Sequence, residues 1–323
     1  MQKHISGPAI FYTSELFERA AEHESFALSY PQDAENPVEN AAEACGKTMK
    51  NYRLCHGFST RHGGISTLPH LSDLNFGFGL GEPRETTLTN YARFASLLGI
   101  DAEHLLAARQ THTDRVMTVG TDHRGLGLTA AEDEIPLAPD FRDGWDAFVT
   151  DAPDVALSVR IADCVPVLFW DPVHGVIGAA HAGWRGTYGE IVGKTVCGME
   201  RLGADRKTVL ACIGTSIGVC CYEIDDAFYE RFLERFGEDI CARVFTVWEN
   251  GRRHCDLRLL NRLILEKNGV APSHIEVSAL CTCCDPAQFH SHRAAMKRDG
   301  KRGLMAAVIA MESEKCPEKA LKG

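Results

Sequence analysis

RIADCVPVLFWDPVHGVIGAAHAGWRGT, residues 160–187, contains two short apolar runs separated by the turn-forming residues DPVHG. Residues 165–169 and 176–180 are partly β-branched and bounded by turn signals, which is typical of buried strands. We therefore predict a hairpin of two core strands. The segment GWRG that follows, residues 183–186, is too rich in glycine for a helix interior, and we expect it to lead into an amphipathic helix over 188–202.

Two reactive side chains lie at the ends of this hairpin. Cys164 precedes the first strand and His181 follows the second, so the fold would place a thiol and an imidazole at one edge of a sheet. They could form a nucleophile–base pair, because an imidazole activates a neighbouring thiolate. They could instead bind a metal together with His112 of the polar turn QTHTD, since two imidazoles and one thiolate suit a catalytic zinc with an open fourth position. A third interpretation is structural, with a core cysteine and a hydrogen-bonded histidine.

The rest of the chain alternates helices and strands. Helical spacing and capping residues predict helices from Ser14 to about 22, over 84–98, from Asp225 or Asp226 to about 236, and from Asp256 to 267. Strands are expected at 104–109 and 115–119, which we predict to pair with each other, and at 207–213, 275–280 and 304–311. Because several strands are joined by short turns, we predict a mixed-sheet α/β or α+β fold rather than a doubly wound parallel sheet.

Composition limits the class of protein. The chain has 323 residues, of which 45% are hydrophobic and 24% charged, as in ordinary globular proteins. Its net charge of −10 argues against a general nucleic-acid binder, although a small anion could still bind a local arginine pocket. We find no apolar run of membrane-spanning length and no signal peptide, so we expect no membrane partner and a cytoplasmic location. The 13 cysteines are expected to be mostly reduced, because their number is odd and the chain is long.

Several motifs in register resemble the YfiH-like family, long labelled multicopper polyphenol oxidases or laccase-domain proteins. They are RIADCVPVLFWDP and GVIGAAHAGWRGT in the central stretch, HGFSTRHGGIS, LNFG and QTH before it, and GTSIGVCCYEI and CTCCDPAQFHSHR after it. The resemblance covers about residues 54–311, which we take as a catalytic domain. Residues 1–53 are then an N-terminal extension that packs on this domain, and residues 312–323 a disordered charged tail.

The resemblance implies a fold, a cofactor and an activity. Family members are single-domain layered sandwiches of mixed sheets with one metal site, usually zinc and less often copper, whose ligands correspond to His112, Cys164 and His181. They are described as purine nucleoside phosphorylases with adenosine deaminase and methylthioadenosine phosphorylase activity. The expected partners are therefore phosphate and a purine nucleoside such as adenosine, inosine or guanosine. Bacterial members are also called peptidoglycan editing factors, which hydrolyse a wrongly built cell-wall precursor.

Four further residues are candidates around this centre. Asp163 is adjacent to the ligand cysteine and could handle protons during deamination, or could only orient a ligand. Arg61 and Arg185 are candidate phosphate clamps, because guanidinium groups match phosphate oxygens, although either could form a structural ion pair. Asn75 is a candidate substrate-binding residue that could instead close a loop turn.

Two further possibilities carry less support from the residues: one comes from the family label and the other from the cysteines of this sequence. A multicopper oxidase is not expected, because only His290 and His292 have the His-x-His spacing that such copper sites use. The cysteines could hold a second, structural zinc, but they lack CxxC spacing at two positions, and we expect them to pack near the active site. These cysteines are Cys220, Cys221, Cys281, Cys283 and Cys284. Thr113 stands where the family usually has glycine, which puts substrate preference in doubt more than metal binding.

Overall fold

The two predicted central strands form a hairpin. β8 (Val165–Asp171) pairs antiparallel with β9 (Val176–Ala182), and Pro166 lies opposite His181. Every residue of both strands is buried. Alternate side chains face opposite ways, so that Phe169 packs against helices whereas Leu168 packs between two sheets. The hairpin is thus confirmed, and it lies at the centre of the molecule because both of its faces are covered.

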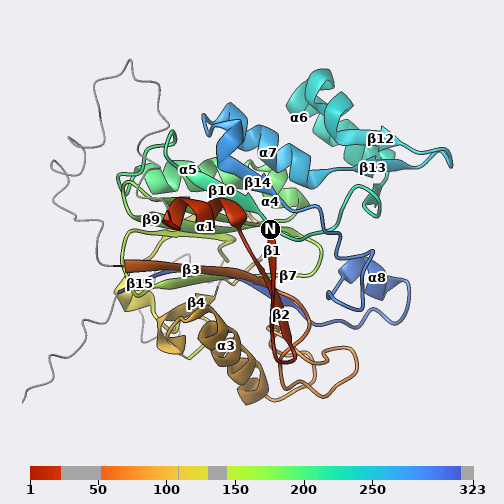
Figure 1. Cartoon of the computed structure of the whole chain (residues 1–323). Coiled ribbons are helices and arrows are strands. Elements are labelled where there is room, and N and C mark those ends of the chain that lie inside the picture. The colour runs from red at the N-terminus through yellow and green to blue at the C-terminus, as the bar shows by residue number, and fades with distance from the viewer. Residues whose placement is uncertain (23–51, 108, 130–143, 314–323) are drawn as a thin grey trace, which may run out of the picture.

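Two six-stranded mixed sheets form the body of the molecule (Figure 1). The computed structural model describes residues 1–22, 52–107, 109–129 and 144–313. One sheet has the order β1-β2-β3-β15-β7-β4 and the other β14-β10-β8-β9-β6-β5, and each contains parallel and antiparallel pairs. Their remaining strands are β1 (Gln2–Ser6), β2 (Ala9–Thr13), β3 (Tyr52–Ser59), β4 (Leu105–Ala107), β5 (Val116–Thr118), β6 (Ala147–Thr150), β7 (Ala156–Ile161), β10 (Leu210–Ile213), β14 (Ile275–Val277) and β15 (Met305–Ser313).

Helices cover the outer face of each sheet. α3 (Arg84–Leu98) packs on the first sheet through Tyr91 and Phe94. α5 (Ile191–Glu200) and α7 (Leu257–Lys267) pack on the second, on the opposite side of the molecule (Figure 1). The other α-helices and the third sheet are α4 (Trp184–Tyr188), α6 (Asp226–Val244), α8 (His292–Met296) and the three strands β11 (Glu223–Ile224), β13 (Arg253–Cys255) and β12 (Phe245–Val247). The predicted layered α+β sandwich with mixed sheets is confirmed.

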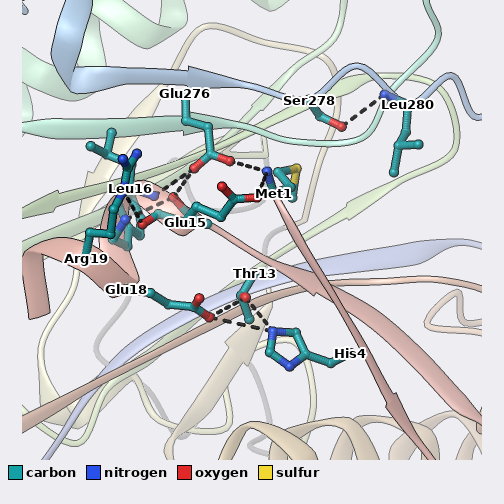
Figure 2. A network of polar contacts seen from close by, with 12 residues as sticks. Met1, His4, Thr13, Glu15, Leu16, Glu18, Arg19, Glu276, Ser278 and Leu280 are labelled. Atoms are coloured by element: carbon teal, nitrogen blue, oxygen red, sulfur yellow. Dashed lines mark hydrogen bonds and ion pairs between the residues drawn. The ribbon is translucent and has the colours of Figure 1, made fainter. Parts of the chain in front are cut away.

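The N-terminal residues contribute to both sheets. β1 and β2 extend the first sheet beyond β3, and α1 (Glu15–Glu22) lies on strands β10 and β14 of the second. Ser14 caps α1 as predicted, since its Oγ accepts from the amide of Phe17 at 3.2 Å. The Ser14 hydroxyl also donates to Glu276 of β14 at 2.6 Å. The Met1 amino group lies 2.6 Å from the Glu276 carboxylate (Figure 2). The sequence predicted the helix but not the two strands.

Two predictions about pairing and helix formation were wrong. β4 and β5 do not pair with each other, because β4 lies beside β7 in the first sheet and β5 lies beside β6 in the second. The GWRG segment forms the start of the short helix α4, whose N-cap is Gly183. Its glycines are tolerated because they allow close contacts: a Cβ at Gly186 would lie 3.0 Å from the carbonyl oxygen of Thr113.

The predicted ends of two elements also differ from the structure. Asp225 caps α6 through the amide of Phe228 at 2.8 Å, but the helix continues past the predicted end at 236, across a break at Gly237. β15 extends to Ser313, so the first two residues of the predicted tail, Glu312 and Ser313, belong to a strand that pairs with β3. The rest of that tail, residues 314–323, and the residues 130–143 lie outside the described part of the chain.

Candidate metal centre

His112, Cys164 and His181 converge at one edge of the second sheet. Their ligand atoms all lie within 4.8 Å of one another. The Sγ of Cys164 is 3.9 Å from Nε2 of His112, and the two imidazole rings lie 5.0 Å apart, nearly perpendicular to each other. His181 is buried in β9, Cys164 is half-buried just before β8, and His112 is exposed. The hairpin supplies two of the three groups and the turn after β4 supplies the third.

The turn that carries His112 is organised by a buried carboxylate that the sequence did not single out. Asp146, directly before β6, accepts from the amides of Thr111, His112 and Thr113 at 2.7–3.2 Å. This set of bonds holds His112 at a φ of 63°, a conformation that non-glycine residues seldom adopt. Asp146 is fully buried, so its charge depends on these donors for stabilisation.

Asp146 also orients His181. Its Oδ1 lies 2.7 Å from Nδ1 of His181, and its carbonyl oxygen accepts from the His181 amide at 2.7 Å. A carboxylate on Nδ1 fixes the imidazole tautomer and leaves Nε2 facing away from it, as in carboxylate–histidine–metal arrangements. No sequence motif marks Asp146 as the carboxylate that orients His181. This role becomes visible only from the pairing of β6 with β9, which sets Ala147 opposite Ala180.

Gly183 lets the three side chains approach each other. A Cβ at this position would lie 3.1 Å from Sγ of Cys164 and 3.1 Å from the His112 ring. A side chain at this position would crowd both groups, so glycine suits the close approach of the thiol and the imidazole.

The charges of the centre are coupled. Burial alone would raise the pKa of Cys164, but the positive charge of His181 and hydrogen bonds from His112 and His181 lower it to about 6. Burial alone would lower the pKa of His181, but the Cys164 thiolate and Asp146 raise it to about 9. The two groups therefore stabilise each other's charged forms, the thiolate and the imidazolium.

The donor set fits a transition-metal ion such as zinc. With a Zn–S distance of about 2.3 Å and a Zn–N distance of about 2.0–2.1 Å, tetrahedral geometry places sulfur and nitrogen about 3.6 Å apart. The Sγ–Nε2 distance between Cys164 and His112 is 3.9 Å, close to that value. Three protein ligands would leave a fourth position for water or substrate, which is the arrangement of catalytic zinc sites.

Asp163 lies next to the centre, but its side chain faces a different set of donors. One carboxylate oxygen accepts from the Thr282 hydroxyl at 2.6 Å and the other from the Arg293 amide at 2.6 Å. The residue is buried and has a φ of 90°. These contacts favour the alternative in which Asp163 orients Cys164 over the one in which it transfers protons.

A basic cavity of ≈ 360 Å³ lies along the segment from Phe289 to Arg302. Its lining includes Arg61, Arg298, Lys301 and Arg302. The same segment contacts the residue before Cys164, because the Arg293 amide donates to Asp163 at 2.6 Å. The cavity therefore offers several cations on a segment that is hydrogen-bonded to Asp163.

The three predicted substrate-binding residues occupy different environments. Arg61 lines the basic cavity, but its guanidinium donates to the carbonyls of Ser72 and Pro286 at 2.9 and 2.8 Å. Arg185 is exposed and stacks on Trp184, with its Cζ 4.2 Å from the ring centroid. Asn75 is fully buried, and both its amide atoms bond within the protein, including a 3.0 Å bond from the Leu304 amide to Oδ1. Binding by these residues stays a prediction, and for Asn75 the contacts favour the turn-closing alternative.

No helix of the described residues is both long and apolar enough to cross a membrane.

Comparisons with known proteins agree with this architecture. The family described as "Multi-copper polyphenol oxidoreductase laccase" matches residues 55–312. The chain is 35% identical to the purine nucleoside phosphorylase YlmD of Bacillus subtilis over 82% of its length and 91% of the relative's. It is 34% identical to the adenosine deaminase RL5 of an unknown prokaryote, over 76% of this chain and 90% of the relative.

A solved structure has the same fold. The Bacillus licheniformis protein YfiH superposes with a TM-score of 0.71 at 33% identity, over 80% of this chain and 93% of that one. The family match runs from Cys55 in β3 to Glu312 in β15 and so includes all three candidate ligands. On both sequence and structure, the chain belongs to the laccase-like YfiH family.

Proposed function

We propose that this protein is a zinc-dependent purine nucleoside phosphorylase whose centre is formed by His112, Cys164 and His181. The observation that carries the proposal is the convergence of these three side chains within 4.8 Å, with Asp146 fixing two of them. A zinc ion held there would supply Lewis acidity next to the substrate. Relatives named purine nucleoside phosphorylase and adenosine deaminase support a purine nucleoside as the substrate.

The basic cavity is the proposed phosphate site. Phosphorolysis requires phosphate to be held against the anomeric carbon of the sugar while the purine leaves. Arg298 and Arg302 offer guanidinium groups that match phosphate oxygens, and Arg61 adds positive charge on the cavity wall. Arg185 is a second candidate for anion binding because its side chain is exposed next to the centre.

The cytoplasmic location expected from the sequence also stays a prediction.

The same centre would serve adenosine deamination and methylthioadenosine phosphorolysis. Deamination needs water instead of phosphate, so the choice between the two reactions depends on which molecule occupies the space beside the ligands. Asp163 would act through Cys164 as a positioning residue, because Thr282 and Arg293 occupy its carboxylate. Laccase activity is not part of the proposal: His290 is buried with its ring nitrogen 3.1 Å from the Leu74 carbonyl oxygen.

One observation favours a second candidate. Cys164, His181 and Asp146 have the order of a thiolate, an imidazole and an orienting carboxylate, and the pKa of Cys164 is lowered to about 6. A metal-free Cys–His hydrolase would use this thiolate as a nucleophile. Such a hydrolase, or a metal-dependent one, could act on an amide of a cell-wall precursor.

Metal content and product analysis test the proposal together. Protein produced without a histidine tag is assayed for zinc and incubated with adenosine, with and without phosphate. We expect adenine only when phosphate is present, and inosine in either case if deamination also occurs. His181→Ala should abolish both products, whereas His174→Ala, at the turn of the same hairpin and paired with Asp171, should change neither.

The outcomes separate the candidates. Turnover by protein that holds no metal at Cys164 would support the Cys–His hydrolase and overturn the zinc centre. Failure to form adenine or inosine above the His181→Ala control would overturn the nucleoside phosphorylase. Zinc with no nucleoside turnover, but with hydrolysis of a cell-wall precursor, would favour the amidohydrolase.

A further inference from the structure

A second group of possible ligands lies on two loops outside the centre described above. Cys220 and Cys221 follow β10, and Cys281 and Cys284 follow β14. β10 and β14 are parallel neighbours, so the ends of both strands meet at the same edge of the sheet. A further bridge joins Ser216 to Cys281 and continues this pairing into the loops. The topology thus brings together cysteines that lie some sixty residues apart.

The four sulfur atoms have the spacing of ligands around one metal ion. All four lie within 4.8 Å of one another. Sγ of Cys284 is 3.4 Å from that of Cys220 and 3.5 Å from that of Cys221. Four thiolates around zinc at about 2.3 Å are about 3.8 Å apart in tetrahedral geometry. Disulfide sulfurs are about 2.05 Å apart, and all four cysteines are free. The close spacing also suits a single ion better than an iron–sulfur cluster, whose bridging atoms separate the thiolates further.

The surroundings of these thiols favour a closed metal site. The amide of Gly218 donates to Sγ of Cys281 at 3.2 Å, the kind of bond that commonly supports metal thiolates. A Cβ at Gly218 would lie 3.3 Å from the Cβ of Cys281, so this glycine lets the first loop approach the second closely. Arg258, which is buried, holds the second loop by donating to the carbonyls of Ser278 and Leu280.

The same loops hold the residue that precedes the ligand Cys164. The Thr282 hydroxyl, between two of the cysteines, donates to Asp163 at 2.6 Å. The amide of Ile217, in the first loop, donates to the Asp163 carbonyl at 2.9 Å. Anything that fixes the two loops relative to each other therefore also fixes the backbone at Asp163.

We propose that Cys220, Cys221, Cys281 and Cys284 form a structural zinc site with four thiolate ligands. The sequence argued against such a site because it lacks two CxxC pairs. In the structure, one CxxC pair, Cys281 with Cys284, supplies two of the thiols, and the adjacent residues Cys220 and Cys221 supply the other two. Four protein ligands leave no open position, so the site would join the two loops without taking part in the reaction. It is independent of the proposed nucleoside phosphorylase activity.

Zinc content tests the site in a chain that lacks the first centre. Cys164→Ala protein is reconstituted with zinc under reducing conditions, and bound zinc is counted by native mass spectrometry. We expect one zinc per chain, and none after Cys284→Ser is added. Cys283→Ser is the matched control, because Cys283 is adjacent in sequence but is not among the four clustered thiols; it should keep the zinc.

A spectroscopic measurement covers the case in which Cys284→Ser fails to fold. Co²⁺ replaces zinc in the Cys164→Ala protein, and the strong visible and sulfur-to-cobalt charge-transfer bands of a tetrathiolate site are recorded. We expect these bands at one equivalent of Co²⁺. Their absence, zinc content below half an equivalent in the reduced Cys164→Ala chain, or equal loss of zinc from Cys283→Ser and Cys284→Ser would each overturn the proposal.

Discussion

Two regions of the molecule bring together side chains with the spacing of metal ligands, but they do so in different ways. One is the centre formed by His112, Cys164 and His181, and the other is the four-cysteine cluster. The first has three proposed ligands of two kinds, two of them on the central hairpin, and its histidines are held by one buried carboxylate. The second has four like ligands on loops. Catalytic zinc sites keep one position open, whereas structural sites are closed by four protein ligands. The comparison teaches what distinguishes a catalytic metal site from a structural one. The number of protein ligands and the type of element that carries them matter more than the identity of the metal.

Removal of a ligand from the open centre should have the largest effect on activity. His181→Ala is expected to lower kcat/KM for adenosine phosphorolysis by roughly 10³-fold, the size of loss seen when a main electrostatic stabiliser of a transition state is removed. His174→Ala should stay within about twofold of the unchanged protein. Steady-state kinetics with saturating phosphate measure both variants. Equal losses in the two would mean that the hairpin, not the centre, had been damaged.

Removal of the orienting carboxylate should have a smaller effect on the same centre. Asp146→Asn keeps the shape of the side chain but weakens the bonds to His181 and to the His112 turn, so zinc affinity should fall about 10–100-fold. Competition with a chromogenic chelator measures the affinity. Asp171→Asn is the control, since Asp171 is equally buried and pairs with His174 at the far end of the hairpin. Zinc affinity unchanged in Asp146→Asn would contradict the role assigned to this residue.

The thiols of the two regions should differ in their response to pH in metal-free protein. The pKa of Cys164 is lowered to about 6, whereas burial and the neighbouring thiols raise that of Cys220 to about 12. Because only the thiolate reacts, alkylation of Cys164 by iodoacetamide should be nearly constant from pH 8 to 7 and fall about tenfold per pH unit below about pH 6.

Alkylation of Cys220 should instead be slow and rise throughout the range from pH 6 to 9. Peptide mass spectrometry of the alkylated chain distinguishes the two sites. A rate at Cys164 that keeps rising between pH 7 and 9 would show that its thiol has an ordinary pKa, and the coupling with His181 would then be absent.

The contact that joins the two regions should have the smallest effect. Thr282→Val removes one hydrogen bond to the buried Asp163 carboxylate, which should cost about 1–3 kcal/mol of stability. In a chain of this size such a loss lowers Tm by several degrees. Differential scanning calorimetry measures it, with exposed Thr118→Val as the control. We expect kcat to fall only a few-fold and KM to stay constant; a Tm equal to that of the control would show that the contact does not stabilise the fold.

The sequence predicted the local parts of this arrangement and missed those that depend on strand order. The hairpin, the caps at Asp225 and Asp256, and the end of α3 at Gly99 follow from short-range patterns. The pairing partners of β4 and β5 do not follow from such patterns, because these two strands are neighbours in the chain but belong to different sheets. β1 and β2 pair with each other locally, but their place in the first sheet depends on the pairing of β2 with β3, a strand that begins at Tyr52.

The candidate ligands could be predicted from the sequence, whereas the residue that orients them could not. His112, Cys164 and His181 lie in motifs that resemble a family, so their convergence was expected. Asp146 has no such motif, and its role requires β6 beside β9. The four-cysteine cluster likewise needs the parallel pairing of β10 with β14, which no spacing rule along the chain reveals.

The most direct test of the account is a joint measurement of zinc content and adenosine phosphorolysis in three chains. The unchanged protein should hold two zinc ions and be active. Cys164→Ala should hold one and lose activity, whereas Cys284→Ser should hold one and keep activity within about tenfold of the unchanged protein. The account is contradicted if Cys164→Ala keeps both zinc ions, or if Cys284→Ser loses activity as completely as Cys164→Ala does.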